Sequence, residues 1–147
     1  MKKILFGILF ILLCAVGYGL YLYNKPHKNV ERASAKETVS ADVLFNEFNS
    51  DETAAMERYA DHVIEVSGMV SYVDLANENE PQIVLEVSDS EGFIRCGFEV
   101  DELNKIKKIE SGSALVVKGL CKGFNHTEGL DLLSDPEVVI SKCTIIE

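Results

Sequence analysis

The chain has 147 residues, with 14 Lys and Arg against 24 Asp and Glu and a formal net charge of −10 at pH 7. This length fits one domain rather than two, and 47% apolar with 26% charged residues exclude a disordered chain. The charge is unevenly distributed. Residues 4–23 carry none, whereas the part from Ser40 onward holds 8 Lys and Arg against 22 Asp and Glu. So acidic a domain is a poor match for a polyanion.

The N-terminal segment is typical of a membrane-spanning helix. Residues 4–23 read ILFGILFILLCAVGYGLYLY, which is 20 residues without a charge. In a helix this run extends about 30 Å, the thickness of the hydrocarbon core of a bilayer. Three tyrosines lie near its end, where aromatic rings favour the headgroup level. We therefore expect a short cytoplasmic N-terminus (1–3) followed by an uncleaved transmembrane anchor (4–23).

Two alternatives to an uncleaved anchor stay open. A cleaved signal peptide usually has a shorter apolar core, about 7–15 residues, that ends in small residues. A lipoprotein would be acylated at Cys14, but Leu13 stands where a small residue is required, and the apolar run continues beyond the cysteine.

The orientation of the anchor is open as well. More Lys and Arg follow the span than precede it, which favours a cytoplasmic domain. A short Lys2-Lys3 head before the first apolar run is instead typical of an export signal. We expect a single-pass membrane protein with its domain outside the cytoplasm, for a reason that comes from the cysteines below.

The segment after the anchor is polar and then turns helical. Residues 24–39 have mixed charge, which predicts a linker. Ser40 is a suitable N-cap for a helix, and Leu44, Phe45 and Phe48 fall on one face of it. Ser50 begins a second turn of the same kind, so we expect one helix or a broken pair over 40–61.

Beyond residue 62 the hydrophobic period changes from 3.6 to 2. Alternating runs predict strands at 63–73, 81–88 and 92–98, a helical period predicts a helix at 99–110, and two more strands follow at 114–122 and 137–146. Strict alternation in the first strand places Tyr72 inward with Val70. Gly68 and Gly119 stand where a tight barrel bends sharply.

Three strands, a helix and two strands is the order of the OB-fold, a five-stranded Greek-key barrel. We therefore predict a mainly β domain with flanking helices over residues 40–147, and the alternative is another small α+β domain.

Several short motifs resemble one family of small bacterial proteins. They are LFNEF at 44–48, VIEVSGMV at 63–70, CGF at 96–98 and VKGLCKGF at 117–124, together with Tyr59 and Cys143. These residues resemble the tRNA-anticodon-like OB-fold family over about residues 40–147. The resemblance implies an OB-fold, often with an N-terminal anchor or lipoprotein signal. It implies no established activity and no catalytic residues. The stretch 125–136 looks longer than the usual connection between the last two strands.

Three cysteines point into the predicted barrel: Cys96, Cys121 and Cys143, on the third, fourth and fifth strands. The fifth strand of an OB barrel lies between the third and fourth, and opposed residues on paired strands are within disulfide range. We predict a Cys121–Cys143 disulfide because their strands are consecutive and adjacent, and such a bond requires an oxidising compartment. The alternative is three buried thiols that serve as small apolar side chains.

No residue pattern indicates catalysis, a cofactor or a metal site. The sequence contains no GxSxG, GxGxxG, P-loop or CxxC motif, and its three histidines have no partner at a nucleophile or ligand spacing. We therefore expect a binding protein rather than an enzyme.

The binding surface is expected on the outer face of the second and third strands, where OB barrels bind their ligands. Outward positions there predict a face of Val84, Glu86, Phe93 and Arg95, with Phe124 nearby. Its apolar members favour a protein or a small ligand in the bacterial cell envelope as the partner. The alternative is single-stranded nucleic-acid binding by a cytoplasmic domain, for which Phe93 and Arg95 supply a stacking ring and a cation. The acidic charge of the domain disfavours that alternative.

Overall fold

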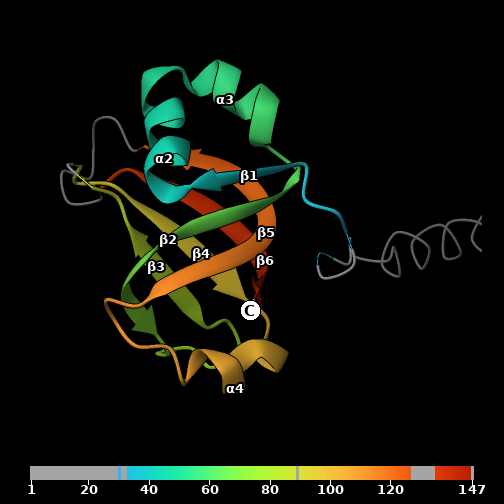
Figure 1. The fold of residues 1–147 in the computed structure, drawn as a ribbon, viewed down its shortest axis with the longest axis vertical. Coiled ribbons are helices and arrows are strands. Elements are labelled where there is room, and N and C mark those ends of the chain that lie inside the picture. Colours follow the sequence, from blue (N-terminus) through green and yellow to red (C-terminus); the bar gives the residue numbers. More distant parts are fainter. Residues whose placement is uncertain (1–29, 31–32, 89, 127–134, 147) are drawn as a thin grey trace, which may run out of the picture.

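The fold is a closed barrel of five strands with helices at both ends (Figure 1). A computed structural model describes residues 30, 33–88, 90–126 and 135–146. The barrel strands are β2 (Val63–Asp74), β3 (Gln82–Glu86), β4 (Phe93–Phe98), β5 (Ala114–Asn125) and β6 (Glu137–Ile146). The predicted OB-fold barrel is confirmed.

The strand pairing follows the Greek-key order. β2 pairs antiparallel with both β3 and β5, β3 pairs with β4, and β6 lies between β4 and β5. The β4–β6 pair is parallel. The fifth barrel strand therefore lies between the third and the fourth, as predicted.

The folded domain begins earlier than the sequence predicts. β1 (Glu37–Ser40) lies within the predicted linker 24–39 and pairs in parallel with β2, with Val39 opposite Val66. Val30 is buried in a small cluster with Val63 and Leu120 on the barrel. The linker boundary at residue 39 is therefore wrong, because a short edge strand forms there from residues without a clear apolar pattern.

Two helices cover one end of the barrel (Figure 1). α2 (Ala41–Ser50) and α3 (Glu52–Tyr59) are the broken pair considered for 40–61. The Val43 N–H donates to Ser40 Oγ at 3.3 Å, and the Ala54 N–H donates to Asp51 Oδ1 at 3.0 Å. Each cap accepts a hydrogen bond from a backbone N–H in the first turn of its own helix. Because the second cap starts a new helix at Asp51, α2 and α3 are separate helices.

The other end of the barrel is covered by α4 (Leu103–Ile106), which follows a 3₁₀ turn at Val100–Glu102 (Figure 1). This segment is shorter than the helix predicted over 99–110. The N–H groups of Lys108 and Ile109 donate to carbonyls three residues back, so the chain tightens into turns after Ile106.

The core fills the barrel interior and extends beneath α2. Leu44, Phe45 and Phe48 of α2 are buried against inward residues of the strands, such as Ile94 and Ile140. The three cysteines that were predicted to point inward, Cys96, Cys121 and Cys143, are all buried in this core.

Tyr72 is an exception to the predicted alternation. The β2–β3 register shifts between Val70 and Tyr72, which turns Tyr72 outward and leaves 48% of it exposed. A β-bulge of this kind reverses the faces of the residues that follow it.

The predicted anchor, residues 4–23, lies outside the described residues. Within the described ranges, no helix is long and apolar enough to cross a bilayer.

Candidate functional site

The outer face of β3 and β4 carries a row of side chains that are neighbours because of the register between the paired strands. Tyr72 on β2 lies opposite Val84 on β3, Val84 lies opposite Arg95 on β4, and Arg95 lies opposite Val139 on β6. We call this surface the β3–β4 face; it comprises Tyr72, Gln82, Val84, Glu86, Phe93, Arg95, Glu137 and Val139.

Arg95 is the centre of this face, and its charge is paired. Its Nε donates to Glu137 Oε2 at 2.6 Å, and its Nη1 donates to Gln82 Oε1 at 2.9 Å. The guanidinium carbon lies 5.3 Å from the centre of the Phe93 ring. Since the Glu137 side chain is only 13% exposed, this ion pair is partly shielded from water. Arg95 is therefore held in place and offers little free positive charge to an anion.

Carboxylates outnumber cations on this face. Its charged members are Arg95, Glu86 and Glu137. Glu86 is exposed on the same face and lies opposite Phe93 in the strand pairing. The face combines aromatic and apolar surface with a neutralised arginine and an excess of negative charge.

The structure brings together four of the five predicted face residues. Val84, Glu86, Phe93 and Arg95 all lie on the β3–β4 face, although Val84 is only 1% exposed and contributes little accessible surface. Gln82, Glu137 and Val139 were not predicted to belong to it. Their membership depends on the register between strands, which a single sequence does not contain.

Phe124 does not lie on this face. Its ring centre is 5.8 Å from that of Phe45 and 5.9 Å from that of Phe48, both on α2. It lies opposite the buried Val138 and therefore faces the same side as the core. Its placement on the binding face is corrected: Phe124 packs the α2 helix onto the barrel.

The three domain cysteines are buried free thiols, so the predicted Cys121–Cys143 disulfide is not formed in the structure. Cys121 lies opposite Ile140, not opposite Cys143. Burial raises the pKa of Cys121 to about 11, and it raises the pKa of Cys143 well above its usual value. Neither thiol is activated as a nucleophile, since the thiolate is the reactive form.

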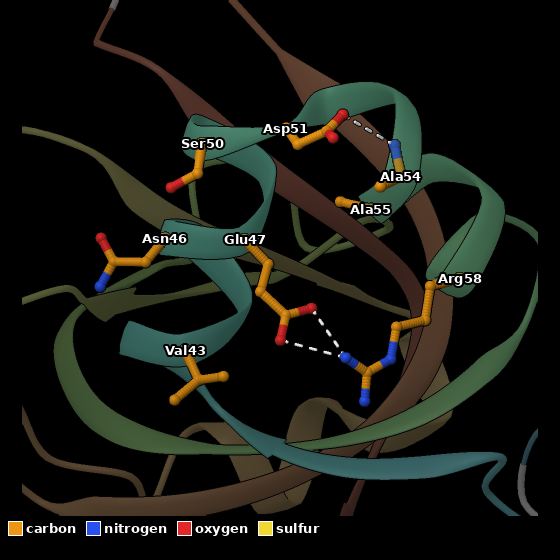
Figure 2. Close-up of a pocket in the computed structure, with 8 residues that line it drawn as sticks. All are labelled: Val43, Asn46, Glu47, Ser50, Asp51, Ala54, Ala55 and Arg58. Atoms are coloured by element: carbon orange, nitrogen blue, oxygen red, sulfur yellow. Dashed lines mark hydrogen bonds and ion pairs between the residues drawn. The ribbon is translucent and has the colours of Figure 1, made fainter.

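A concave surface of about 470 Å³ lies between α2 and α3 (Figure 2). Figure 2 shows Glu47 and Arg58 facing one another across it. Arg58 Nη1 donates to both Glu47 oxygens at 3.1 Å, and the same guanidinium pairs with Glu37 of β1. The hydrogen bond from Arg58 lowers the pKa of Glu37. These contacts of Arg58 join β1, α2 and α3. The charged side chains of this concave surface are therefore explained by their role in holding the fold together.

Within the described ranges, no three His, Cys, Asp or Glu side chains are grouped closely enough to hold a metal ion.

Comparison with one solved structure agrees with this architecture. A lipoprotein of Klebsiella pneumoniae, named as a candidate nucleic acid-binding protein, superposes with a TM-score of 0.57 at 10% identity and covers 83% of this chain and 99% of its own. An OBody bound to hen egg-white lysozyme has a TM-score of 0.39 at 12% identity and covers 58% of this chain and 94% of its own. An asparaginyl-tRNA synthetase of Entamoeba histolytica has a TM-score of 0.40 at 16% identity and covers 58% of this chain and 21% of its own.

At 10% identity, the similarity to the Klebsiella protein shows a shared fold. No curated protein matches the sequence. The profile of the tRNA_anti-like family matches residues 1–135, most of the chain and all of the barrel except β6. This match confirms the resemblance seen in the sequence motifs, and the chain belongs to the tRNA_anti-like family.

Proposed function

We propose that this protein is a binding module, anchored by residues 4–23 in the membrane of the cell envelope, that holds a protein partner on its β3–β4 face outside the cytoplasm. The observation that carries the proposal is the composition of that face: exposed Tyr72 and half-buried Phe93 next to Arg95, whose charge is already paired with Glu137. β3 and β4 are the second and third barrel strands, which form the binding face of OB-folds.

This combination of side chains suits a protein surface. Tyr, Phe and Arg are enriched in protein interfaces, and Tyr and Arg are also frequent among the residues that contribute most to affinity. Arg95 is held by Glu137 and Gln82, so less side-chain entropy is lost when a partner binds. The rim carboxylate of Glu86 would then select a partner with a complementary basic group.

Nucleic-acid binding is the second candidate, because Tyr72 and Phe93 are rings of the kind on which bases stack and because the Klebsiella protein is named for that activity. Single-strand binders also need cations along the backbone path. Arg95 is engaged by Glu137, and Glu86 on the same face adds a negative charge that repels phosphates. These charges favour the protein partner.

Photo-crosslinking in intact cells tests the proposal. A photoreactive amino acid at Tyr72 is compared with one at Val43 on α2, because both side chains are 48% exposed and only Tyr72 lies on the β3–β4 face. We expect a discrete adduct from position 72 that protease removes and nuclease leaves intact, and no adduct from position 43.

The double substitution Phe93→Ala plus Arg95→Ala removes two side chains of the β3–β4 face and tests whether the adduct depends on them. It is expected to abolish the adduct at position 72 while circular dichroism shows a folded barrel. Equal adducts at both positions, or an adduct at position 72 that nuclease digests, would refute a protein partner on this face.

A further inference from the structure

A cavity opens on the β3–β4 face one row beyond Arg95. The strand pairing places Gln82 of β3 opposite Gly97 of β4, next to the row in which Val84 lies opposite Arg95. Gly97 has no side chain, and a Cβ at this position would have its nearest contact at 3.8 Å. The row therefore has an empty position at its centre, where Gln82 and Gly97 line a cavity of about 580 Å³.

A bulge in β6 forms the other side of this cavity. The register between β4 and β6 shifts around Gly97, so that this one residue faces both Ser141 and Lys142. Lys142 has a backbone φ of 53°, in the left-handed region. A bulge of this kind bends its strand, and both of its residues line the cavity. Paired strands therefore build the floor of the cavity.

The carboxylates that line the cavity have no partner in the fold. Glu80, Glu99 and Asp101 are exposed at its edge. Among the residues that the structure describes, none accepts a hydrogen bond or ion pair at the side chain of these three. Two neighbouring carboxylates outside the cavity are paired with lysines instead: Glu78 with Lys107 and Glu102 with Lys105.

The chemistry of the lining favours an organic cation on a flexible stem. Its carboxylates outnumber its one described cation, Lys142, by three to one. In the described part of the chain, acidic groups are not gathered closely enough to hold a metal ion. Val100, which is 57% exposed, adds apolar surface to the lining. The methylene groups of lysine and arginine pack on such surface while the charged head stays among polar groups.

We propose that this cavity receives an arginine or lysine side chain of the protein partner held on the β3–β4 face. The inference rests on the proposed function and names the chemistry by which the partner is recognised. Gln82 joins the cavity to the centre of the face, because its Oε1 accepts a hydrogen bond from Arg95 Nη1 at 2.9 Å. Complementary charge across an interface mainly supplies specificity and a faster association.

Nuclear magnetic resonance of the isotope-labelled full chain in a zwitterionic detergent tests the cavity. The probe is N-acetyl-arginine amide, and the matched control is N-acetyl-citrulline amide, which has nearly the same shape and no charge. We expect the arginine probe to shift the backbone amides of Gly97, Val100 and Ser141 until they saturate, and the citrulline probe to shift none. Shifts that fail to saturate, that spread over the whole acidic surface, or that both probes produce overturn the proposal.

The substitution Gly97→Leu tests the cavity by filling it. We expect the saturable shift at Ser141 to disappear while the melting temperature stays close to that of the wild type, since the added side chain points outward into open space. An unchanged titration in this variant would show that the arginine probe binds elsewhere.

Charge substitutions supply a second test that leaves the strands untouched. Glu80→Gln plus Glu99→Gln is expected to raise the Kd of the arginine probe about fivefold, because exposed ion pairs are individually weak. Glu52→Gln plus Glu57→Gln on α3 changes the net charge equally at exposed positions of the other end of the barrel, and it should leave the Kd within about twofold. Equal weakening by the two pairs would mean that the probe responds to net charge alone.

The adduct from position 72 in intact cells separates this inference from the proposed function. We expect Gly97→Leu to abolish that adduct. An adduct that persists in Gly97→Leu leaves the protein partner in place and overturns its use of the cavity. Saturable arginine binding without any adduct at position 72 supports the cavity as a site for a basic group and counts against a protein partner on this face.

Discussion

Replacing Gly119 with alanine is expected to lower the free energy of unfolding by about 3 kcal/mol or more, through overpacking of the barrel. A Cβ at this position would lie 2.4 Å from Cγ2 of Ile140 and 2.7 Å from Sγ of Cys143. Both neighbours are short, buried and fixed by their strand, so neither can swing away. The β5–β6 register also shifts between Lys118 and Leu120, which places the backbone of Gly119 close to β6.

Gly97→Ala is the matched control, because it adds the same methyl group to β4, the strand on the other side of β6. A Cβ at Gly97 meets its nearest atom, the carbonyl oxygen of Ile140, at 3.8 Å, which is ordinary contact. We expect this variant to unfold within about 0.5 kcal/mol of the wild type. Urea denaturation of both variants compares them, and equal midpoints would contradict the close approach at Gly119.

Removing residues 4–23 from the full chain is expected to move the protein completely from the membrane fraction to the soluble fraction. Twenty uncharged residues match the thickness of a bilayer core, and no other means of attachment is proposed. Alkaline carbonate extraction followed by sedimentation measures the change. The full chain should resist extraction, and the shortened chain should remain in the supernatant without treatment.

Cys14→Ala tests whether the attachment is a lipid instead of a helix. We expect this variant to stay in the membrane fraction, with the N-terminal sequence of the mature protein still beginning before residue 4. Release of Cys14→Ala would indicate acylation, and an N-terminus beyond residue 23 would indicate a cleaved signal.

The barrel strands were predictable because their inward residues alternate along the sequence. Ile94, Cys96 and Phe98 of β4, for example, are all buried as the pattern predicts. β1 was missed because it is a four-residue edge strand whose stability comes from pairing with β2, far along the chain. The last part of the predicted 99–110 helix is a series of turns. The hydrophobic periodicity of the sequence does not distinguish such turns from an α-helix.

The candidate face was only partly predictable, for the same reason. Alternation identifies Phe93 and Arg95 as outward positions, but the ion pair of Arg95 with Glu137 joins residues 42 positions apart. The β-bulge after Val70 reverses Tyr72, and the register shift between Cys96 and Phe98 places Cys143 opposite Phe98. The register between strands is set by packing of the whole barrel. The neighbours of each side chain are therefore known only when the fold is known.

A titration of labelled single-stranded DNA and RNA with the full chain in detergent tests most directly whether the β3–β4 face is built for a protein. Low ionic strength is the most demanding condition, because phosphate contacts are strongest there. The acidic surroundings and the occupied Arg95 predict no change in fluorescence anisotropy. Binding that weakens with the logarithm of the salt concentration and is lost in Arg95→Gln would show that nucleic acid occupies this face.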